Sequence, residues 1–212
     1  MNPSRKHRIG VMAVLAFTGP VAAAGLLACS DEDTSESAQP SATATVTVPT
    51  GLRWQTFQGV DLPVADQGPR HTDGPVASGF ARSPAGAALT AIHATVRISI
   101  ATDNQWPTVG QRMLAPGQGR DSWATARAQI SITTPIASGA PKVLGYVIAR
   151  YTPDATDVDI YTIHPDNSVT RNSTHVTWQG DDWRLRLPDN TTAAPVAAVA
   201  MPPVDMVALT PR

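Results

Sequence analysis

The 212-residue sequence predicts a single α+β domain, in which two or three helices pack on a curled, four-stranded antiparallel sheet. Apolar residues first recur at helical spacing, between residues 83 and 130. From Lys142 onward the period changes to two, in segments rich in β-branched and aromatic side chains. Helices followed by a run of strands are typical of the α+β class. The length suits one domain with a core of its own.

The first predicted helix begins at Ser83-Pro84. Serine is a favoured N-cap residue, and proline suits the first helical position. The apolar residues that share one face of this helix are Ala85, Leu89, Ile92 and Val96. β-Branched residues at alternating positions beyond Thr95 predict that the helix ends soon after that residue.

A second helix is predicted from Asp121 to Ile130, after a stretch rich in glycine and proline. Asp121 can serve as its N-cap, and Trp123 follows as the first large apolar residue. The sequence Thr133-Thr134-Pro135 lies beyond the end of this helix, because proline cannot continue one.

Four strands are predicted at residues 143–151, 158–163, 169–178 and 183–187. Short connections rich in Pro, Gly, Asp and Asn join them, so we expect a meander. In the last hairpin the tryptophans and leucines point to the core, whereas Arg184 and Arg186 point away. An earlier extended piece at residues 60–64 contains Pro63, which confines it to a sheet edge or a loop.

The N-terminal segment predicts an exported lipoprotein. Three basic residues precede an uncharged, apolar stretch at residues 11–27, which is the order of a secretory signal. The motif Leu26-Leu27-Ala28-Cys29 then resembles the lipobox of bacterial lipoprotein signal peptides. Cys29, the only cysteine, is therefore the predicted lipidation site. An ordinary signal peptide or an uncleaved anchor is the alternative, since such a stretch is near the lower limit of roughly 17–25 residues for a bilayer span.

Lipidation at Cys29 divides the chain into four predicted parts. They are a signal peptide at residues 1–28, a disordered polar linker at 29–51, the globular domain at 52–188 and a Pro/Ala-rich tail at 189–212. We expect the tail to be loose, with docking on the domain as the alternative. A coil of roughly 22 residues reaches about 25 Å, so the linker holds the domain close to the membrane. The lipid places the protein on the extracytoplasmic face of the cell membrane.

The charge balance of the mature chain gives no support to nucleic-acid binding. Cleavage removes three of the 16 basic side chains, which leaves 13 against 17 acidic ones. Nucleic-acid-binding domains usually present a basic face. The expected partners are therefore the membrane, through the lipid on Cys29, and an envelope protein of unknown identity.

Short motifs in the domain carry a resemblance to known proteins. Tyr151-Thr152-Pro153-Asp154 at the end of the first long strand, with the closing hairpin at residues 176–185, resembles the nuclear-transport-factor-2-like cone fold. Gly79-Phe80-Ala81-Arg82 and Gly119-Arg120-Asp121-Ser122-Trp123-Ala124 each precede a helix. Their order resembles uncharacterised actinobacterial envelope lipoproteins, some encoded with conjugative or integrative elements. The resemblance covers residues 57–188 and implies no catalytic residue.

Histidines and carboxylates supply the few candidates for acid-base or metal chemistry. His71 and Asp73 lie in one loop, where a surface turn is the simpler interpretation because no third ligand is near. His93 on the first helix would face the cavity of a cone fold, although a hydrogen-bonded helix histidine is the simpler interpretation. A further acidic run contains Asp154, Asp157, Asp159, His164 and Asp166. It lacks the central glycine and terminal glutamate of a calcium loop, which favours solvated carboxylates.

Two further groups of residues concern binding. Arg184 and Arg186 could form a cationic patch with Arg150 or Arg171, or remain solvated on the sheet. The residues expected to line a cone cavity, or to fill it themselves, are Leu89, Ile92, Trp123, Tyr146 and Trp178. No recognised catalytic motif is present, and no glutamate follows Val48. We predict no catalytic, cofactor-binding or metal-binding residue.

These observations predict a non-catalytic accessory or scaffold lipoprotein, which the resemblance connects with a conjugation-type transfer system. An envelope protein that binds a small hydrophobic ligand or lipid is the alternative. An enzyme that uses His93 or His71 with an aspartate is a third hypothesis, and the absence of catalytic motifs argues against it.

Overall fold

The computed structural model of the protein describes residues 47–72, 74–189 and 195–209. All of them belong to one unit, Ala42–Arg212. The predicted signal peptide, Cys29 and most of the predicted linker lie outside the described residues. Within the part of the chain that the structure describes, no helix has the length and apolar character that a membrane span requires.

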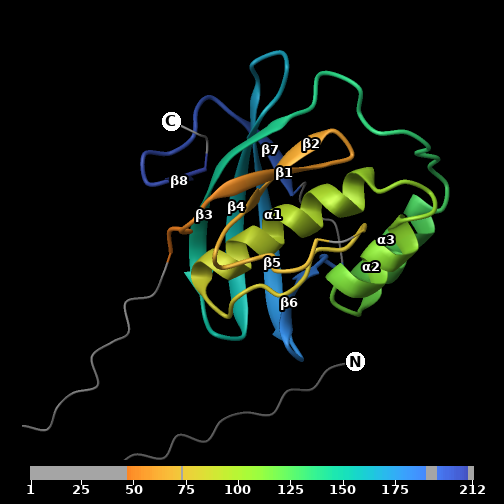
Figure 1. Ribbon diagram of the computed structural model, residues 1–212, viewed down its shortest axis with the longest axis horizontal. Coiled ribbons are helices and arrows are strands. Elements are labelled where there is room, and N and C mark those ends of the chain that lie inside the picture. The colour runs from red at the N-terminus through yellow and green to blue at the C-terminus, as the bar shows by residue number, and fades with distance from the viewer. Residues whose placement is uncertain (1–46, 73, 190–194, 210–212) are drawn as a thin grey trace, which may run out of the picture. The chain divides into compact units, whose positions relative to one another are not determined.

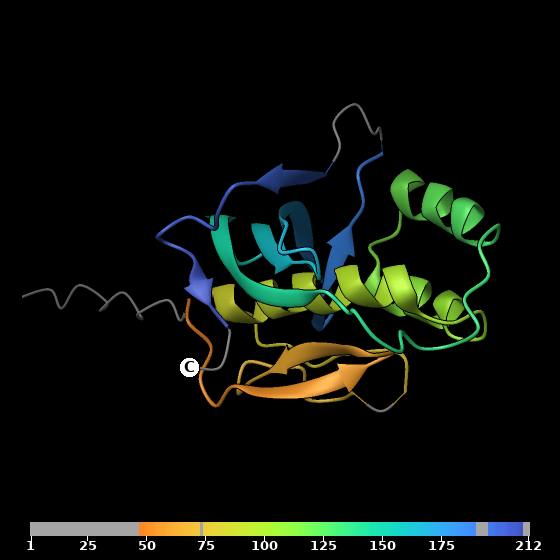
Figure 2. The same ribbon diagram turned by 90° about the horizontal axis from the view of Figure 1, so that it is seen from above.

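Helix α1 (Pro84–Ile100) lies in the middle of three layers (Figure 2). A hairpin of β1 (Arg53–Phe57) and β2 (Val60–Val64) covers one side of it. A large antiparallel sheet covers the other side. Two short helices, α2 (Trp106–Met113) and α3 (Gln118–Arg127), follow at one end of α1 (Figure 1). The α+β class predicted from the sequence is therefore confirmed, and so is the strand expected around Pro63.

The large sheet has six strands instead of the predicted four. Its members are β3 (Lys142–Tyr151), β4 (Ala155–Ile163), β5 (Val169–Gln179), β6 (Asp182–Arg186), β7 (Val196–Val199) and β8 (Val207–Ala208). The strand order is β6-β5-β4-β3-β8, and β7 pairs with β5. Every pairing is antiparallel. The predicted meander corresponds to β3 to β6 and is confirmed.

The two additional strands come from the predicted tail at residues 189–212. β7 pairs with β5, β8 pairs with β3, and Leu209 is fully buried. The expectation of a loose tail was wrong for residues 195–209. The tail's prolines lie outside these two strands, so they limit strand length without preventing edge pairing. When the tail pairs as strands, the backbone N–H and C=O groups at the sheet edges form hydrogen bonds with it. With a loose tail these groups would bond to water instead.

The last residues of the predicted linker also belong to the domain. The Tyr146 hydroxyl donates to the carbonyl oxygen of Thr47. The Thr50 amide donates to the side chain of Gln67 at 2.9 Å. The ordered domain therefore begins before the predicted boundary at residue 52.

Helix α1 begins as the sequence predicts and ends later. The amide of Gly86 donates to Ser83 Oγ at 3.2 Å, which confirms Ser83 as the N-cap. The helix continues through Ile100, so the prediction that it ends soon after Thr95 was wrong. Ile98 is buried in the core, and burial of this kind outweighs the weak helix propensity of β-branched residues.

Buried polar side chains join α1 to the β1–β2 hairpin. His93 Nε2 lies 2.8 Å from the carbonyl oxygen of Pro63, and Arg97 Nη1 donates to the carbonyl of Pro75 at 2.8 Å. The guanidinium of Arg97 also lies 4.2 Å from the centre of the Phe57 ring. Arg97 Nε donates to His93 Nδ1 at 3.4 Å, so the histidine is the neutral tautomer that carries its proton on Nε2.

Helices α2 and α3 differ from the sequence prediction. Helix α2 was not predicted. Helix α3 starts at Gln118 after its N-cap Gly117 and ends at Arg127, so the predicted N-cap at Asp121 and the end at Ile130 were wrong. A Cβ atom on Gly110 would lie 2.3 Å from the Trp123 ring, so α3 can only pack on α2 because residue 110 is glycine.

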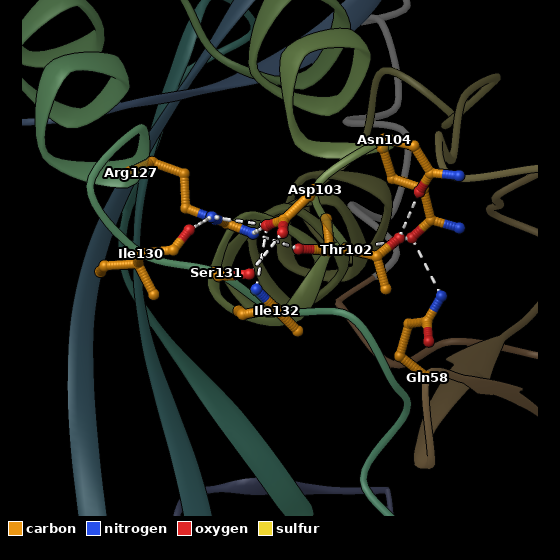
Figure 3. A network of polar contacts seen from close by, with 10 residues as sticks. Gln58, Thr102, Asp103, Asn104, Arg127, Ile130, Ser131 and Ile132 are labelled. Atoms are coloured by element: carbon orange, nitrogen blue, oxygen red, sulfur yellow. Dashed lines mark hydrogen bonds and ion pairs between the residues drawn. The ribbon is translucent and has the colours of Figure 1, made fainter.

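Figure 3 shows the polar network that holds α3 and the following segment against the end of α1. Arg127 is 4% exposed and donates to the carbonyl of Ala101 at 2.7 Å, and its guanidinium lies 3.4 Å from the Asp103 carboxylate. Asp103 also accepts hydrogen bonds from the amide of Ile132 and from Ser131 Oγ. These two hydrogen bonds are the main cause that holds the pKa of Asp103 below its usual value.

The buried histidine predicts a loss of stability in weak acid. Burial, and then the charge of Arg97, lower the pKa of His93 from 6.5 to about 3. Protons therefore bind preferentially to the unfolded chain below pH 6.5, and stability falls as the pH falls towards 3. Between pH 7 and 5 the free energy of unfolding should decrease by about 2 kcal/mol. Urea unfolding at both pH values should show a smaller decrease in His93→Gln and an unchanged decrease in the control His71→Gln, whose side chain is exposed.

Gly110→Ala should destabilise the protein. At an exposed helix position this substitution stabilises by roughly 0.5–1 kcal/mol, but here the new methyl group meets the Trp123 ring. We expect a loss of about 1–3 kcal/mol, as in other overpacked sites. Urea unfolding measures it, with Thr108→Ala on an exposed position of α2 as the control. A stabilised Gly110→Ala variant would show that α3 does not pack on α2 in this way.

Candidate functional site

A groove of about 620 Å³ opens between the C-terminal half of α1 and the β5 edge of the large sheet. Its apolar lining includes Ile98, Val158, Leu185 and Leu187. The polar residue Thr95 also lines it, and Thr95 Oγ1 is buried without a hydrogen-bond partner among the described residues. The volume lies within the range of roughly 300–1,000 Å³ that is typical of small-molecule sites.

The groove exists because the edge of the sheet is interrupted. β6 and β7 pair with the same edge of β5, one after the other. The chain leaves that edge after Arg186, which pairs with His175, and returns at Pro195, whose carbonyl accepts from the amide of Ser173 at 2.9 Å. The two partners on β5, His175 and Ser173, are only two positions apart. The edge next to Thr174 is therefore open to the groove.

One row of polar residues crosses four strands beside this opening. Strand register places Arg150, Asp157, His175 and Arg186 opposite one another on β3, β4, β5 and β6. Arg150 Nε donates to Asp157 Oδ2 at 2.8 Å, and His175 Nδ1 lies 2.5 Å from Asp157 Oδ1. The last three residues of the row line the groove.

The Asp157 carboxylate is the centre of this row. Its partial burial opposes ionisation, but the hydrogen bonds from His175 and Arg150 outweigh that effect and hold its pKa below the usual value. An ionised Asp157 keeps a proton on His175 Nδ1, and no described residue bonds to His175 Nε2. That nitrogen can therefore form a hydrogen bond with a molecule in the groove.

Comparison with protein-family models matches residues 18–202 to a domain of unknown function, DUF8175. The chain belongs to this family. The matched region includes every described helix and strand except β8. Neither the curated proteins nor the solved structures contain a match.

The histidines singled out in the sequence are not gathered at the groove of this DUF8175 domain. His93 is fully buried between α1 and β2, where it contributes to packing. His71 is exposed and pairs with Ser78 through the backbone, and Asp73 lies outside the described residues. Cys29 also lies outside them.

The acidic run is divided among three places in the DUF8175 domain. Asp154 pairs with Arg82 in the β3–β4 turn, whereas Asp166 accepts from the amide of Ser168 in the β4–β5 turn at the other end of β4. Of the run, only Asp157 and Asp159 line the groove. In residues 47–72, 74–189 and 195–209 no three His, Cys, Asp or Glu side chains are placed to hold a metal ion together.

The four arginines do not form one cationic patch. Arg150 pairs with Asp157, and Arg186 lies 3.6 Å from Asp189. Arg184 donates to the carbonyl of Gln111 at 3.1 Å. The remaining one, Arg171, pairs with Ala197 of β7 at the far end of β5. Each is therefore placed by a different local partner.

Of the two expectations for the predicted cavity residues, the one in which they fill the space themselves is confirmed. Leu89, Ile92 and Tyr146 are fully buried core residues, and Trp123 and Trp178 pack against that core. None of the five lines the groove. Their side chains fill the space between helix and sheet, and the groove lies further along α1.

His175 is a groove residue that was not predicted from the sequence. It alternates with the core residue Val176 on β5, so the period of two places it on the polar face. Its partner Asp157 is 18 positions away, and only the register of β4 against β5 brings the two together. On the same face Ser173 Oγ donates to Asp159 at 2.5 Å, so this serine is not aligned with His175 as a nucleophile.

Both neighbours of Asp157 should contribute to its low pKa. His175→Ala and Arg150→Gln should each raise the pKa of Asp157 towards the usual aspartate value, because each removes a hydrogen bond to the carboxylate. NMR titration of the carboxyl carbon measures the pKa. Arg184→Gln, which changes a strand arginine that bonds elsewhere, is the control. An unchanged pKa in the first two variants would contradict the geometry of the row.

Proposed function

We propose that this DUF8175 protein is a membrane-anchored extracytoplasmic lipoprotein whose domain binds a small, partly apolar molecule in the groove without catalysing a reaction. The groove beside α1 carries this proposal. Most of the exposed surface of its lining is apolar, and polar side chains from α1, β4, β5 and β6 lie around that surface. This combination is typical of sites that hold an amphipathic molecule.

The polar row indicates which part of the ligand lies where. The apolar body contacts Ile98, Leu185 and Leu187, which line the groove. A hydroxyl group lies near His175 Nε2 and Arg186, because Nε2 accepts a hydrogen bond when the ring proton is on Nδ1, and the guanidinium of Arg186 donates one. A lipid or a hydrophobic metabolite with a polar end has this chemistry.

The arrangement of α1 on the sheet supports the cone-like interpretation of the domain. Proteins with that fold often enclose an apolar space between helix and sheet. In this chain core side chains fill most of that space, and the groove remains at its edge, where the sheet is interrupted. The placement outside the cell depends on lipidation of Cys29, which only the sequence supports. Intact mass of the protein from membranes tests it through the mass of the attached lipid.

A scaffold role is the second proposal. The observation that favours it is the row on the sheet face, where the Arg150 side chain is 63% exposed and the ion pair with Asp157 is accessible. Such a surface suits a polar contact with another envelope protein. In this proposal the protein is an accessory component of a conjugation-type transfer system, as the sequence resemblance implies.

A groove-filling substitution distinguishes the two proposals. Ser99 lies on the groove wall, and Ser99→Phe places a ring in it. The probe is anilinonaphthalene sulfonate, which has an apolar body and an anionic group. We expect Ser99→Phe to weaken its binding about tenfold, which corresponds to about 1.4 kcal/mol.

Thr125→Phe on α3 is the matched control. Both hydroxyls are exposed, and each donates to the carbonyl four residues earlier in its helix. Fluorescence titration of the two variants should differ only if the probe occupies the groove. Equal binding by both variants would remove the ligand proposal and leave the scaffold proposal.

A further inference from the structure

The loop between β7 and β8 presents large apolar side chains to solvent. Val204 is fully exposed and Met201 is 75% exposed. Exposed apolar residues occur singly on most proteins, so exposure alone does not mark an interaction surface. This loop is also fixed at both ends and lies near the start of the described chain, and these two features distinguish it from other exposed apolar residues.

The loop is held in place by the strands on either side of it. β7 pairs with β5, and β8 pairs with β3. The amide of Met206 donates to the carbonyl of Pro203 at 3.2 Å and closes a turn. Beyond β8, the Leu209 amide donates to the carbonyl of Leu144 at 2.9 Å. Val204 is therefore presented by a fixed turn, which costs little additional entropy when it binds.

The described chain begins at the same end of the sheet. The carbonyl of Thr47 accepts from the hydroxyl of Tyr146, and Tyr146 pairs with Val207 of β8. Val48 is 58% exposed. Figures 1 and 2 both show the start of the described chain and the loop before β8 on the same side of the domain.

We propose that the loop at residues 200–206 contacts the lipid surface and orients the domain on the membrane. This inference rests on the proposed lipid at Cys29. Only 18 positions separate Cys29 from Thr47, and a segment of this length spans at most roughly 60 Å. The anchor therefore keeps this end of the domain near the bilayer, where Val204 and Met201 can lie in the interface.

The charges within the segment that contains the loop indicate which kind of lipid surface it contacts. Residues 195–209 contain no lysine or arginine, and their one charged residue is Asp205, beside Val204. The contact therefore depends on apolar insertion and not on attraction to anionic lipid. Asp205 stays at the level of the head groups, while the apolar side chains enter the boundary between head groups and acyl chains, to a depth of about 5–10 Å.

Fluorescence quenching by labelled lipids tests the contact. Acylation consumes the thiol of Cys29, so Val204→Cys gives the mature lipoprotein one free thiol for an environment-sensitive dye. Ile130→Cys is the matched control, because Ile130 is an apolar residue, 56% exposed, whose amide donates to Arg127 at the end of α3. Helix α3 lies on the opposite side of the domain from the loop before β8 in Figure 1. Both proteins are reconstituted in phosphatidylcholine vesicles, with or without bromine on the acyl chains.

We expect brominated lipid to quench the dye at position 204 and to leave the dye at position 130 unchanged. Equal emission at position 204 in both kinds of vesicle, with the protein bound to them, overturns the inference. A blue shift of the dye emission without quenching by brominated lipid also overturns it, since the loop then contacts a second copy of the protein. The wild-type protein is treated with the same dye as a control. If the wild-type protein is labelled, the Cys29 thiol is free, and the proposed anchoring has failed instead of the loop contact.

Discussion

Burial of α1 from both sides is the constraint on which the rest of the structure depends. The five alanines of the helix have no exposed surface, so the hairpin and the sheet approach it closely. Residues 84–94 of the helix are all buried, so a long polar side chain on this face cannot reach solvent. His93 and Arg97 are therefore satisfied by backbone carbonyls of the hairpin and the following loop, and by the Phe57 ring.

The groove and the loop before β8 follow from how the sheet completes its edges around this helix. The chain after β6 leaves the β5 edge and returns to it as β7, and the interval opens the groove beside the last turns of α1. The same segment then reaches the opposite edge and pairs with β3 as β8. One stretch of chain, expected to be loose, thus forms part of the groove wall and presents the exposed turn.

The candidate site was only partly predictable from sequence. Arg186 is a polar position on a predicted strand, and Asp157 directly precedes the strand predicted at residues 158–163; alternation with core residues places both on the outer face. Their meeting with His175 depends on the register of three separate strand pairs. A shift by one residue in any pair would separate the row. Sequence alone also left open whether the large apolar residues surround a cavity or fill it, and the structure shows that they fill the core.

By itself, the sequence determined the class of the domain, the start of α1 and the meander from β3 to β6, because local caps, turns and periodicity decide these features. Tertiary structure decided where α1 ends, that α2 and α3 pack through Gly110 and Trp123, and that the tail becomes two strands. Each of these depends on contacts between distant parts of the chain. Such contacts add free energy that local propensity does not contain, and they outweigh it at β-branched helix residues and among prolines.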